Sequence, residues 1–366
     1  MSTARSTNRL VLPSMTRVSD LADEPFDVVP VPKGEWENGQ YVVVEIAGDE
    51  GNRSYNIELA GGRLAEIAPG DQLVAALGRR AATLQCVGDW ESVESIDEMD
   101  LLSIAGVAGR CLSQSAFVAP LAPLTYVGHV QRDGHRVNVA DFAADHAPRP
   151  LSLPTVLIIG TSMDAGKTTA AVRIIRTLVA RGLRVAGVKF TGMGRYRDVL
   201  AMRDAGAEWI LDFVDGGIPS TVVPPDEFRA VATTLLARID DLEADVVVLE
   251  AGASPLEPYN GDVAVELLGE AVRAIVLCAS DPYAAVGVLQ AFGVEPTLVA
   301  GRATCTDAGT SLTATLTGCP ALNLLDPSDW PQLEQMLEER LDLPPRTTEA
   351  PPESPANAVR HPKEPI

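Results

Sequence analysis

The sequence contains little that would support a metal–thiolate site, a disulfide framework or a membrane span. Its 366 residues include only four histidines and five cysteines, which are widely spaced and never form a C-x-x-C pair. This pattern predicts reduced thiols and excludes a transition-metal cluster. No apolar run approaches the length of a membrane span, and the N-terminus lacks the apolar core of a signal peptide. We therefore expect a cytoplasmic protein that does not associate with membranes.

Positive charge is also scarce. The chain has 29 basic residues against 50 acidic ones, for a formal net charge of -21. This excess of negative charge disfavours nucleic acids and anionic membrane surfaces as partners. Only four of the basic residues are lysines: Lys33, Lys167, Lys189 and Lys363. Lysine is therefore kept at few positions, which indicates places where a compact ammonium serves better than a planar guanidinium.

Composition and hydrophobic periodicity divide the chain into four expected segments. Residues 1–38 are polar, contain prolines and show no sustained period, which predicts a disordered arm. Residues 39–150 carry short β-like runs between turn signals, which predicts a small antiparallel barrel or sandwich. Within that segment, residues 97–116 resemble a helix with small residues on its packing face. Residues 343–366 are polar and rich in proline, and they predict a disordered tail.

The remaining segment, residues 151–342, has a different pattern. Short apolar runs alternate with longer amphipathic stretches, which predicts a doubly wound, mainly parallel sheet with helices on both faces. The fold class expected for the chain is therefore α/β, with a smaller β-rich N-terminal domain. Ligands of such parallel sheets bind beyond the carboxyl ends of the strands.

The most informative motif follows the first apolar run of this segment. Gly160 and Gly166 stand at the spacing G-x-x-x-x-G-K-[ST] of a phosphate-binding loop, and a helical pattern follows them. Glycines let backbone N–H groups turn towards phosphate oxygens, and the N-terminus of the helix adds positive potential. The residues expected to bind the nucleotide are Gly160, Thr161, Ser162, Met163, Asp164, Ala165, Gly166, Lys167, Thr168 and Thr169.

Two lysines and two acids complete the expected site. Lys167 is expected to reach the β and γ phosphates, and the Thr168 hydroxyl to ligate Mg²⁺. Glu250 and Asp212 each end an apolar run, and both are expected on the metal side. Lys189 ends another run, where it would neutralise a transferred phosphoryl group or a substrate carboxylate. We therefore expect Lys167, Lys189 and Glu250 to be catalytic.

Other polar side chains near these strand ends are candidate substrate contacts. Each also has an ordinary interpretation as a solvated or turn residue. These candidates are Arg195, Arg197, Asp215, Ser254, Tyr259, Asn260 and Asp262.

Part of the motif pattern resembles dethiobiotin synthetase and its relatives. The shared features are Gly160-Thr161, the run Asp164-Ala-Gly-Lys-Thr168, the lysine after the second strand and a later strand ending in Glu-x-Gly. The resemblance implies a P-loop enzyme that uses MgATP to activate a carboxyl or carbamate group. Ser162 stands where that family usually has aspartate.

A second resemblance covers residues 154–325. The order of its short motifs is similar to the C-terminal P-loop domain of a bacterial family that includes proteins assigned to D-glutamate N-acylation. Residues 1–150 do not resemble the N-terminal half that is usual in that family. The motifs are Gly160-Thr161, Gly166-Lys-Thr168, Thr191-Gly192, Asp212-Phe-Val-Asp-Gly216, Glu250-Ala-Gly-Ala-Ser254, Tyr259-Asn-Gly261 and Ala274-Ile-Val-Leu-Cys278.

Together these features predict an ATP- and Mg²⁺-dependent enzyme, a ligase or kinase-like phosphotransferase, that phosphorylates or activates a small anionic metabolite. ATP is favoured over GTP because the sequence has no Asn-Lys-x-Asp guanine-reading motif. Two alternatives stay open: an acyltransferase whose loop holds the phosphate of an acyl carrier such as acetyl-CoA, and a nucleotide-dependent switch or metallochaperone-like GTPase. Relatives of the P-loop group often bind substrate across a dimer interface, which favours a homodimer.

Overall fold

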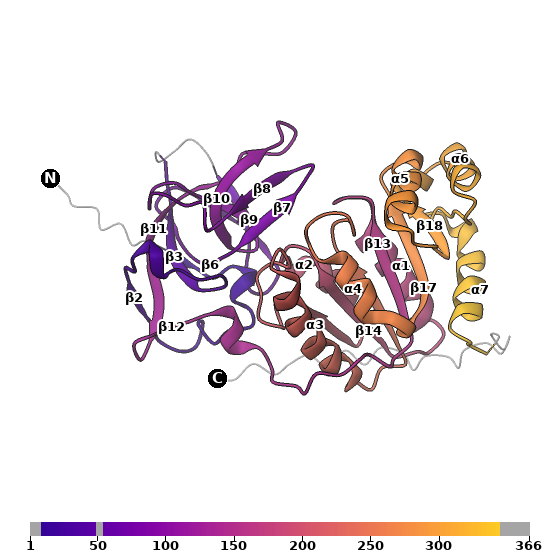
Figure 1. The fold of residues 1–366 in the computed structure, drawn as a ribbon, viewed down its shortest axis with the longest axis horizontal. Helices are drawn as coiled ribbons and strands as arrows, with labels where there is room; N and C mark the ends of the chain where they lie inside the picture. The colour runs from indigo at the N-terminus through magenta and orange to yellow at the C-terminus, as the bar shows by residue number, and fades with distance from the viewer. Residues whose placement is uncertain (1–8, 49–53, 345–366) are drawn as a thin grey trace, which may run out of the picture.

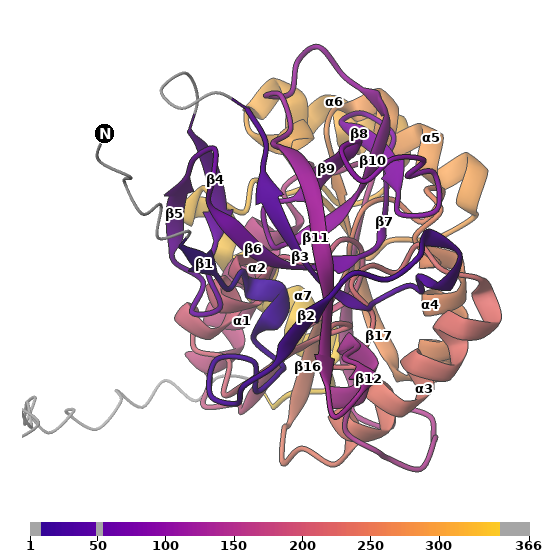
Figure 2. The ribbon, with the colours of Figure 1, turned by 90° about the vertical axis from the view of Figure 1, so that its left-hand side faces the viewer.

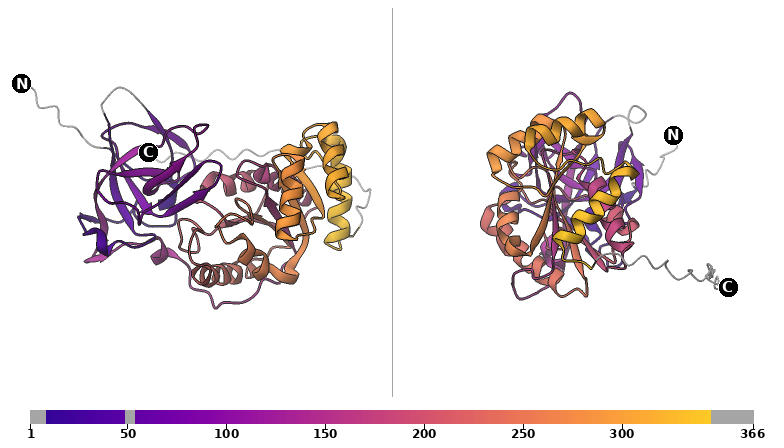
Figure 3. Two further views of the ribbon diagram at one scale, coloured as in Figure 1. Left: turned by 45° about the horizontal axis from the view of Figure 1, so that its top comes forward. Right: turned by 90° about the vertical axis from the view of Figure 1, so that its right-hand side faces the viewer.

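The computed structural model describes residues 9–48 and 54–344. They form two parts that lie side by side along the long axis of the molecule (Figure 1). The described residues up to 142 form the barrel half, and residues 143–344 form the P-loop half. Figure 3 shows the same division from two further directions. None of the described helices combines the length and apolar character needed to cross a bilayer.

The barrel half is built from short strands. Strands β6, β3, β11, β9 and β10 are neighbours in that order, and β10 pairs with β6 in turn, so the five strands close into a ring. Such closure removes open sheet edges. The strands are β1 (Leu10–Val11), β2 (Asp27–Val29), β3 (Tyr41–Ile46), β4 (Tyr55–Glu58), β5 (Leu64–Ile67), β6 (Gln72–Leu77), β7 (Arg79–Ala82), β8 (Cys86–Asp89), β9 (Met99–Ser103), β10 (Val107–Gln114), β11 (Pro123–Arg132) and β12 (His135–Arg136). The short 3-10 helices are η1 (Ser14–Thr16), η2 (Lys33–Glu35) and η3 (Val139–Phe142).

Two expectations for the N-terminal region were wrong. Residues 97–116 form β9 and β10 rather than a helix. Their small residues serve close approach of strands: a Cβ added at Gly109 would lie 2.7 Å from the backbone of Asp89. The described part of the expected arm, residues 9–38, is also ordered. Met15 there is only 1% exposed. Isolated apolar side chains of this segment enter the core without a regular period, so hydrophobic periodicity did not reveal them.

The P-loop half contains the expected parallel sheet, in the order β15-β14-β16-β13-β17-β18. The α/β fold class is thus confirmed, together with the β-rich N-terminal part. The strands are β13 (Thr155–Gly160), β14 (Val185–Thr191), β15 (Trp209–Asp212), β16 (Val246–Ala251), β17 (Val272–Ala279) and β18 (Leu298–Gly301). The helices are α1 (Lys167–Val179), α2 (Tyr196–Asp204), α3 (Pro225–Asp240), α4 (Gly261–Leu268), α5 (Pro282–Phe292), α6 (Asp307–Thr317) and α7 (Trp330–Arg340), with short 3-10 helices η4 (Gly269–Ala271), η5 (Arg302–Thr304) and η6 (Pro327–Asp329).

Both faces of the parallel sheet are buried under helices. Alternate side chains of β13 point to opposite faces, as the period of two in a strand requires. Leu157 and Ile159 join an apolar cluster with α3, α4 and α5, whereas Val156 and Ile158 join another with α1, α2 and α7. The sheet is therefore packed between two layers of helices, and its buried charged residues lie near the carboxyl ends of the strands. The expected tail from residue 345 onward lies outside the described residues.

The carboxyl edge of the sheet faces the barrel half. The apolar cluster that contains Leu157 also includes Tyr41 and Val43 of β3, so one core spans both halves. Close backbone approach is visible at Gly194, where an added Cβ would lie 2.5 Å from Met15 Cε. Seen from the barrel end, β3 and β11 lie in front of the parallel sheet (Figure 2). The fold thus covers the strand ends, where ligands of parallel sheets bind, with a second structural unit.

Candidate functional site

The loop after β13 has the strand–loop–helix geometry that the motif predicts. Gly166 adopts a φ of 105° and Asp164 a φ of 61°, which turns the backbone sharply into α1. A Cβ added at Gly160 would lie 2.8 Å from Lys167 Cδ, because the lysine side chain folds back across this glycine. The first glycine of the motif therefore makes room for the lysine, and the second allows the turn.

Lys167 is the first residue of α1, and its side chain is buried. Its Nζ donates a hydrogen bond to the Ser162 carbonyl oxygen at 2.8 Å, within the same loop. Burial lowers the pKa of this ammonium, and the nearby Glu250 carboxylate offsets part of the effect. A buried cation at the N-terminus of a helix, where backbone N–H groups are also free to donate, is suited to bind an anion.

Thr168 and Glu250 meet beside the loop. The Thr168 hydroxyl donates a hydrogen bond to Glu250 Oε2 at 3.2 Å. Glu250 as a whole residue is only 3% exposed. Burial and the nearby Asp198 raise the pKa of Glu250, against the opposing effect of Lys167 and Lys189. A hydroxyl and a carboxylate are hard oxygen ligands, so this pair fits Mg²⁺ that takes its remaining ligands from phosphates and water.

Strand register explains why these side chains converge. Glu250 of β16 is the pairing partner of Ile158 in β13 on one side and of Lys189 in β14 on the other. Three strands therefore end together, one in the phosphate loop, one in a carboxylate and one in an ammonium. The order of the strands brings together residues that are far apart in the sequence.

Lys189 is held firmly at the end of β14. Its Nζ donates to the Met193 carbonyl oxygen at 2.8 Å and to Asp198 Oδ2 at 2.5 Å. Burial alone lowers the pKa of Lys189, but the carboxylates of Asp198 and Glu250 together raise it above its ordinary value. The lysine is therefore a fixed cation, and one of its three N–H donors is not used by these two bonds.

Asp212 does not share the metal side with Thr168 and Glu250, which departs from our expectation. Arg17 donates to Asp212 Oδ1 at 2.5 Å and to Asp215 Oδ1 at 2.9 Å. Burial raises the pKa of Asp212 to about 6, although Arg17 opposes the shift. Both aspartates therefore attach an N-terminal arginine to the P-loop half. The sequence alone gives no signal for this pairing, because Arg17 lies in the segment that was expected to be disordered.

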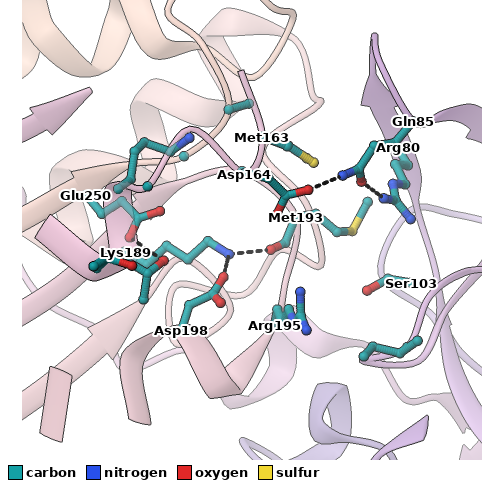
Figure 4. A pocket seen from close by; sticks show the side chains of 18 residues that line it. Arg80, Gln85, Ser103, Met163, Asp164, Lys189, Met193, Arg195, Asp198 and Glu250 are labelled. Atoms are coloured by element: carbon teal, nitrogen blue, oxygen red, sulfur yellow. Dashed lines mark hydrogen bonds and ion pairs between the residues drawn. The ribbon is translucent and has the colours of Figure 1, made fainter. Parts of the chain in front are cut away.

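A cavity of about 450 Å³ lies between the phosphate loop and the barrel half. Figure 4 shows Glu250 and Lys189 on one side of it, and Arg80, Gln85 and Ser103 on the other. Gln85 Nε2 bridges the two halves by donating to Asp164 Oδ2 of the phosphate loop at 2.8 Å. Residues of the expected site that line the cavity are Met163, Asp164, Gly166, Lys167, Thr168, Thr169, Lys189, Arg195 and Glu250.

Sequence reasoning missed the contributions of the barrel half and of Asp198. Arg80 and Gln85 belong to the β7–β8 hairpin, which carries no recognisable motif. Asp198 stands three residues after Arg195 in a polar stretch, and only its contact with Lys189 distinguishes it from a solvated acid. Asp198 lies only nine positions after Lys189 in the sequence, so it was a possible partner for that lysine. Arg80 could be placed at the site only from the tertiary structure.

Several weaker candidates are structural. The Tyr259 hydroxyl accepts a hydrogen bond from the Ala81 amide at 3.0 Å, and Asn260 Nδ2 donates to the Thr221 and Val223 carbonyl oxygens. These bonds hold the loop after β16 against neighbouring segments and against the β7–β8 hairpin. Neither side chain lines the cavity, and the same is true of Arg197, Asp215, Ser254 and Asp262.

A family model matches residues 143–345. The family is described as a domain of unknown function (DUF1611_C), P-loop domain. The matched region begins just after η3 and ends at residue 345, so it corresponds to the P-loop half. The match identifies this half as a P-loop domain.

A curated protein is also similar to part of the chain. A cobyric acid synthase from Mycolicibacterium vanbaalenii is 29% identical over 138 residues, which cover 28% of this chain and 28% of that protein. This chain therefore matches only a little over a quarter of the length of that curated relative.

Two solved structures are also similar to part of the chain. The hydrogenase maturation factor HypB from Archaeoglobus fulgidus is 14% identical with a TM-score of 0.36, over 52% of this chain and 90% of that one. HypB from Helicobacter pylori, solved in complex with nickel, is 15% identical with a TM-score of 0.34, over 54% and 91%. Similarities this remote carry no functional argument.

Proposed function

We propose that this chain, which belongs to the DUF1611 P-loop domain family, is an enzyme that uses MgATP to phosphorylate or activate a small anionic metabolite, in the manner of the dethiobiotin synthetase-like group. The observation that carries the proposal is the cavity in which Lys167, Lys189 and Glu250 converge beside the phosphate loop. Burying two ammonium groups and a carboxylate is costly unless they act on a ligand or on one another.

The residues of the P-loop half have distinct roles in this proposal. The amides of the loop and Lys167 would bind the β and γ phosphates, with α1 directing its positive end to the same anion. Thr168 and Glu250 would hold Mg²⁺, which supplies positive charge at the phosphate oxygens. Lys189, fixed by Asp198 and the Met193 carbonyl oxygen, would stabilise negative charge that develops during transfer.

The size and composition of the cavity favour a small acceptor. A volume of about 450 Å³ lies within the range of small-molecule sites. Its wall combines the phosphate loop with polar side chains from the barrel half, which would shield transfer from water. The name of the curated relative, cobyric acid synthase, is that of an enzyme and is consistent with this class of function.

Calorimetric titration with ATP, GTP and acetyl-CoA, each with Mg²⁺, tests the proposal. We expect ATP to bind with one site per chain and more tightly than the other two. Tight binding of acetyl-CoA without an ATP signal would instead favour acyl transfer. Binding of GTP in clear preference to ATP would favour the nucleotide-dependent switch. Either result would overturn the proposed reaction class.

A further inference from the structure

The wall of the cavity farthest from Glu250 is formed largely by the barrel half. Arg80 of β7 and Ser103 of β9 lie there (Figure 4). Arg195, the residue just before α2, lines the same cavity. None of these residues belongs to the phosphate-binding motif. Two guanidinium groups thus line a cavity whose opposite side already holds two lysines.

Arg80 has only neutral partners among the described residues. Its Nη1 donates to the Leu102 carbonyl oxygen at 2.5 Å, and its Nη2 donates to Gln85 Oε1 at 2.6 Å. Its Nε is buried and has no hydrogen-bond partner within the described chain. Since Gln85 is itself bound to Asp164, the arginine is held in place while its charge remains without a carboxylate.

Arg195 is more isolated still. In the part of the chain that the structure describes, its side chain makes neither a hydrogen bond nor an ion pair, and its Nε is buried. The nearest candidate on α2, Asp198, is already bound to Lys189 at 2.5 Å. Other described arginines, such as Arg203, Arg273 and Arg302, also lack an ion pair. Arg80 and Arg195 differ from them because each combines a buried Nε that has no hydrogen-bond partner with a place in the wall of this cavity.

We infer that Arg80 and Arg195 bind an oxyanion group of the acceptor, which enters the cavity opposite the nucleotide phosphates. Guanidinium groups suit this task because their planar donors match carboxylate and phosphate oxygens. The barrel half thereby becomes the acceptor-binding half, with Arg80 as its main contact. The inference rests on the proposed function, since it names a partner for the nucleotide in the same cavity.

The acceptor subsite can be tested with simple anions. The protein is first saturated with the non-hydrolysable analogue AMP-PNP and Mg²⁺, so that added anions do not compete for the phosphate loop. Succinate and inorganic phosphate are then titrated calorimetrically into the wild type and into Arg80→Gln and Arg195→Gln. Arg110→Gln is the matched control, because Arg110 lies on β10 beside the hairpin, pairs with Glu94 and Glu98, and does not line the cavity.

We expect at least one anion to bind the wild type, and its affinity to fall tenfold or more in each cavity variant but not in Arg110→Gln. Preference for succinate would identify a carboxylate acceptor, and preference for phosphate a phosphorylated one. Arg80→Lys, which keeps the charge, should recover part of the affinity. Melting curves of all variants verify that they fold.

Three results would overturn the inference. Neither anion binds the wild type, or both bind the cavity variants as well as they bind the wild type, or Arg80→Gln and Arg195→Gln weaken AMP-PNP itself by a similar factor. The last result would assign the arginines to the nucleotide. If AMP-PNP fails to bind the wild type, the proposed function fails separately, and the same anion titrations without nucleotide still decide whether the arginines form an anion site.

Discussion

The two halves of the molecule each hold buried polar side chains, and two examples serve different purposes. In the barrel half, His129 is fully buried between the Tyr126 hydroxyl at 2.6 Å and Gln40 Oε1 at 3.1 Å. In the P-loop half, Lys167 and Glu250 are buried beside a cavity. Buried polar groups that satisfy one another stabilise a fold, whereas charges collected at a cavity are available to a ligand.

The β7–β8 hairpin is the exception within the barrel half. It is joined to the P-loop half by the bonds of Ala81 to Tyr259, of Thr83 to Glu257 and of Gln85 to Asp164. These contacts place Arg80 at the cavity. One half therefore supplies the phosphate loop, and the hairpin of the other half, together with Ser103 of β9, forms the facing wall of the cavity.

Of the substitutions that test this difference between the halves, Glu250→Gln should have the largest effect, which is a loss of turnover. Glu250→Gln keeps the size of the side chain but removes the charge that would hold Mg²⁺. We expect turnover to fall by on the order of 100- to 1000-fold, comparable to the loss of one key electrostatic group at an active site. The measurement is nucleotide turnover as a function of Mg²⁺ concentration.

Asp212→Asn is the matched control for this experiment. Asp212 also ends a strand of the same sheet, but it is bound to Arg17 and lies outside the cavity. Its variant should keep the wild-type dependence on Mg²⁺ even if it melts at a lower temperature. Equal loss of Mg²⁺ dependence in both variants would erase the distinction between the two acids.

His129 tests the structural side of the comparison. Burial lowers the pKa of His129 to about 4 from an ordinary 6.5, so the unfolded chain takes up a proton before the folded chain does. The stabilisation is complete above pH 6.5 and is lost as the pH falls towards 4. At pH 4.5 the loss amounts to roughly 2–3 kcal/mol.

Urea unfolding of the wild type and of His129→Gln at pH 7.5 and 4.5 measures this term. The difference in unfolding free energy between the two proteins should shift by that amount in favour of the variant at the lower pH. A shift of zero would show that His129 titrates normally in the folded protein. Nucleotide affinity at pH 7.5 should be the same in both, because His129 does not line the cavity.

Tyr259→Phe should have the smallest effect. It removes the hydroxyl that accepts from the Ala81 amide and leaves that N–H without its partner, at a cost of about 1 kcal/mol. Tyr283→Phe is a suitable control, since Tyr283 as a whole residue is 70% exposed. Calorimetric melting detects the difference; identical melting of the two variants would mean that this bond does not join the halves.

The sequence predicts the P-loop half far better than the barrel half, for a physical reason. Gly160, Gly166 and Lys167 act within one short segment, so their spacing alone encodes a strand, a turn and a helix. Glu250 and Lys189 were recognisable because each ends an apolar run. Parallel strands bring such ends to one edge of a sheet.

The features that were missed depend on contacts between distant segments. Arg17 meets Asp212 across 195 positions, and Gln85 meets Asp164 across 79. The small residues at 97–116 fit either a closely packed helix or closely paired strands, and only the barrel decides between these. Local pattern therefore predicts the side of the cavity that the phosphate loop forms, whereas the side that the barrel half forms requires the fold.

The central claim is that the phosphate loop binds a nucleotide. Calorimetric titration of MgATP into the wild type and Lys167→Ala tests it most directly, with melting curves as the control for folding. We expect one site per chain in the wild type and a loss of affinity of at least about 100-fold in the variant, equivalent to roughly 2.7 kcal/mol. Equal affinity of the two folded proteins for MgATP would contradict the account.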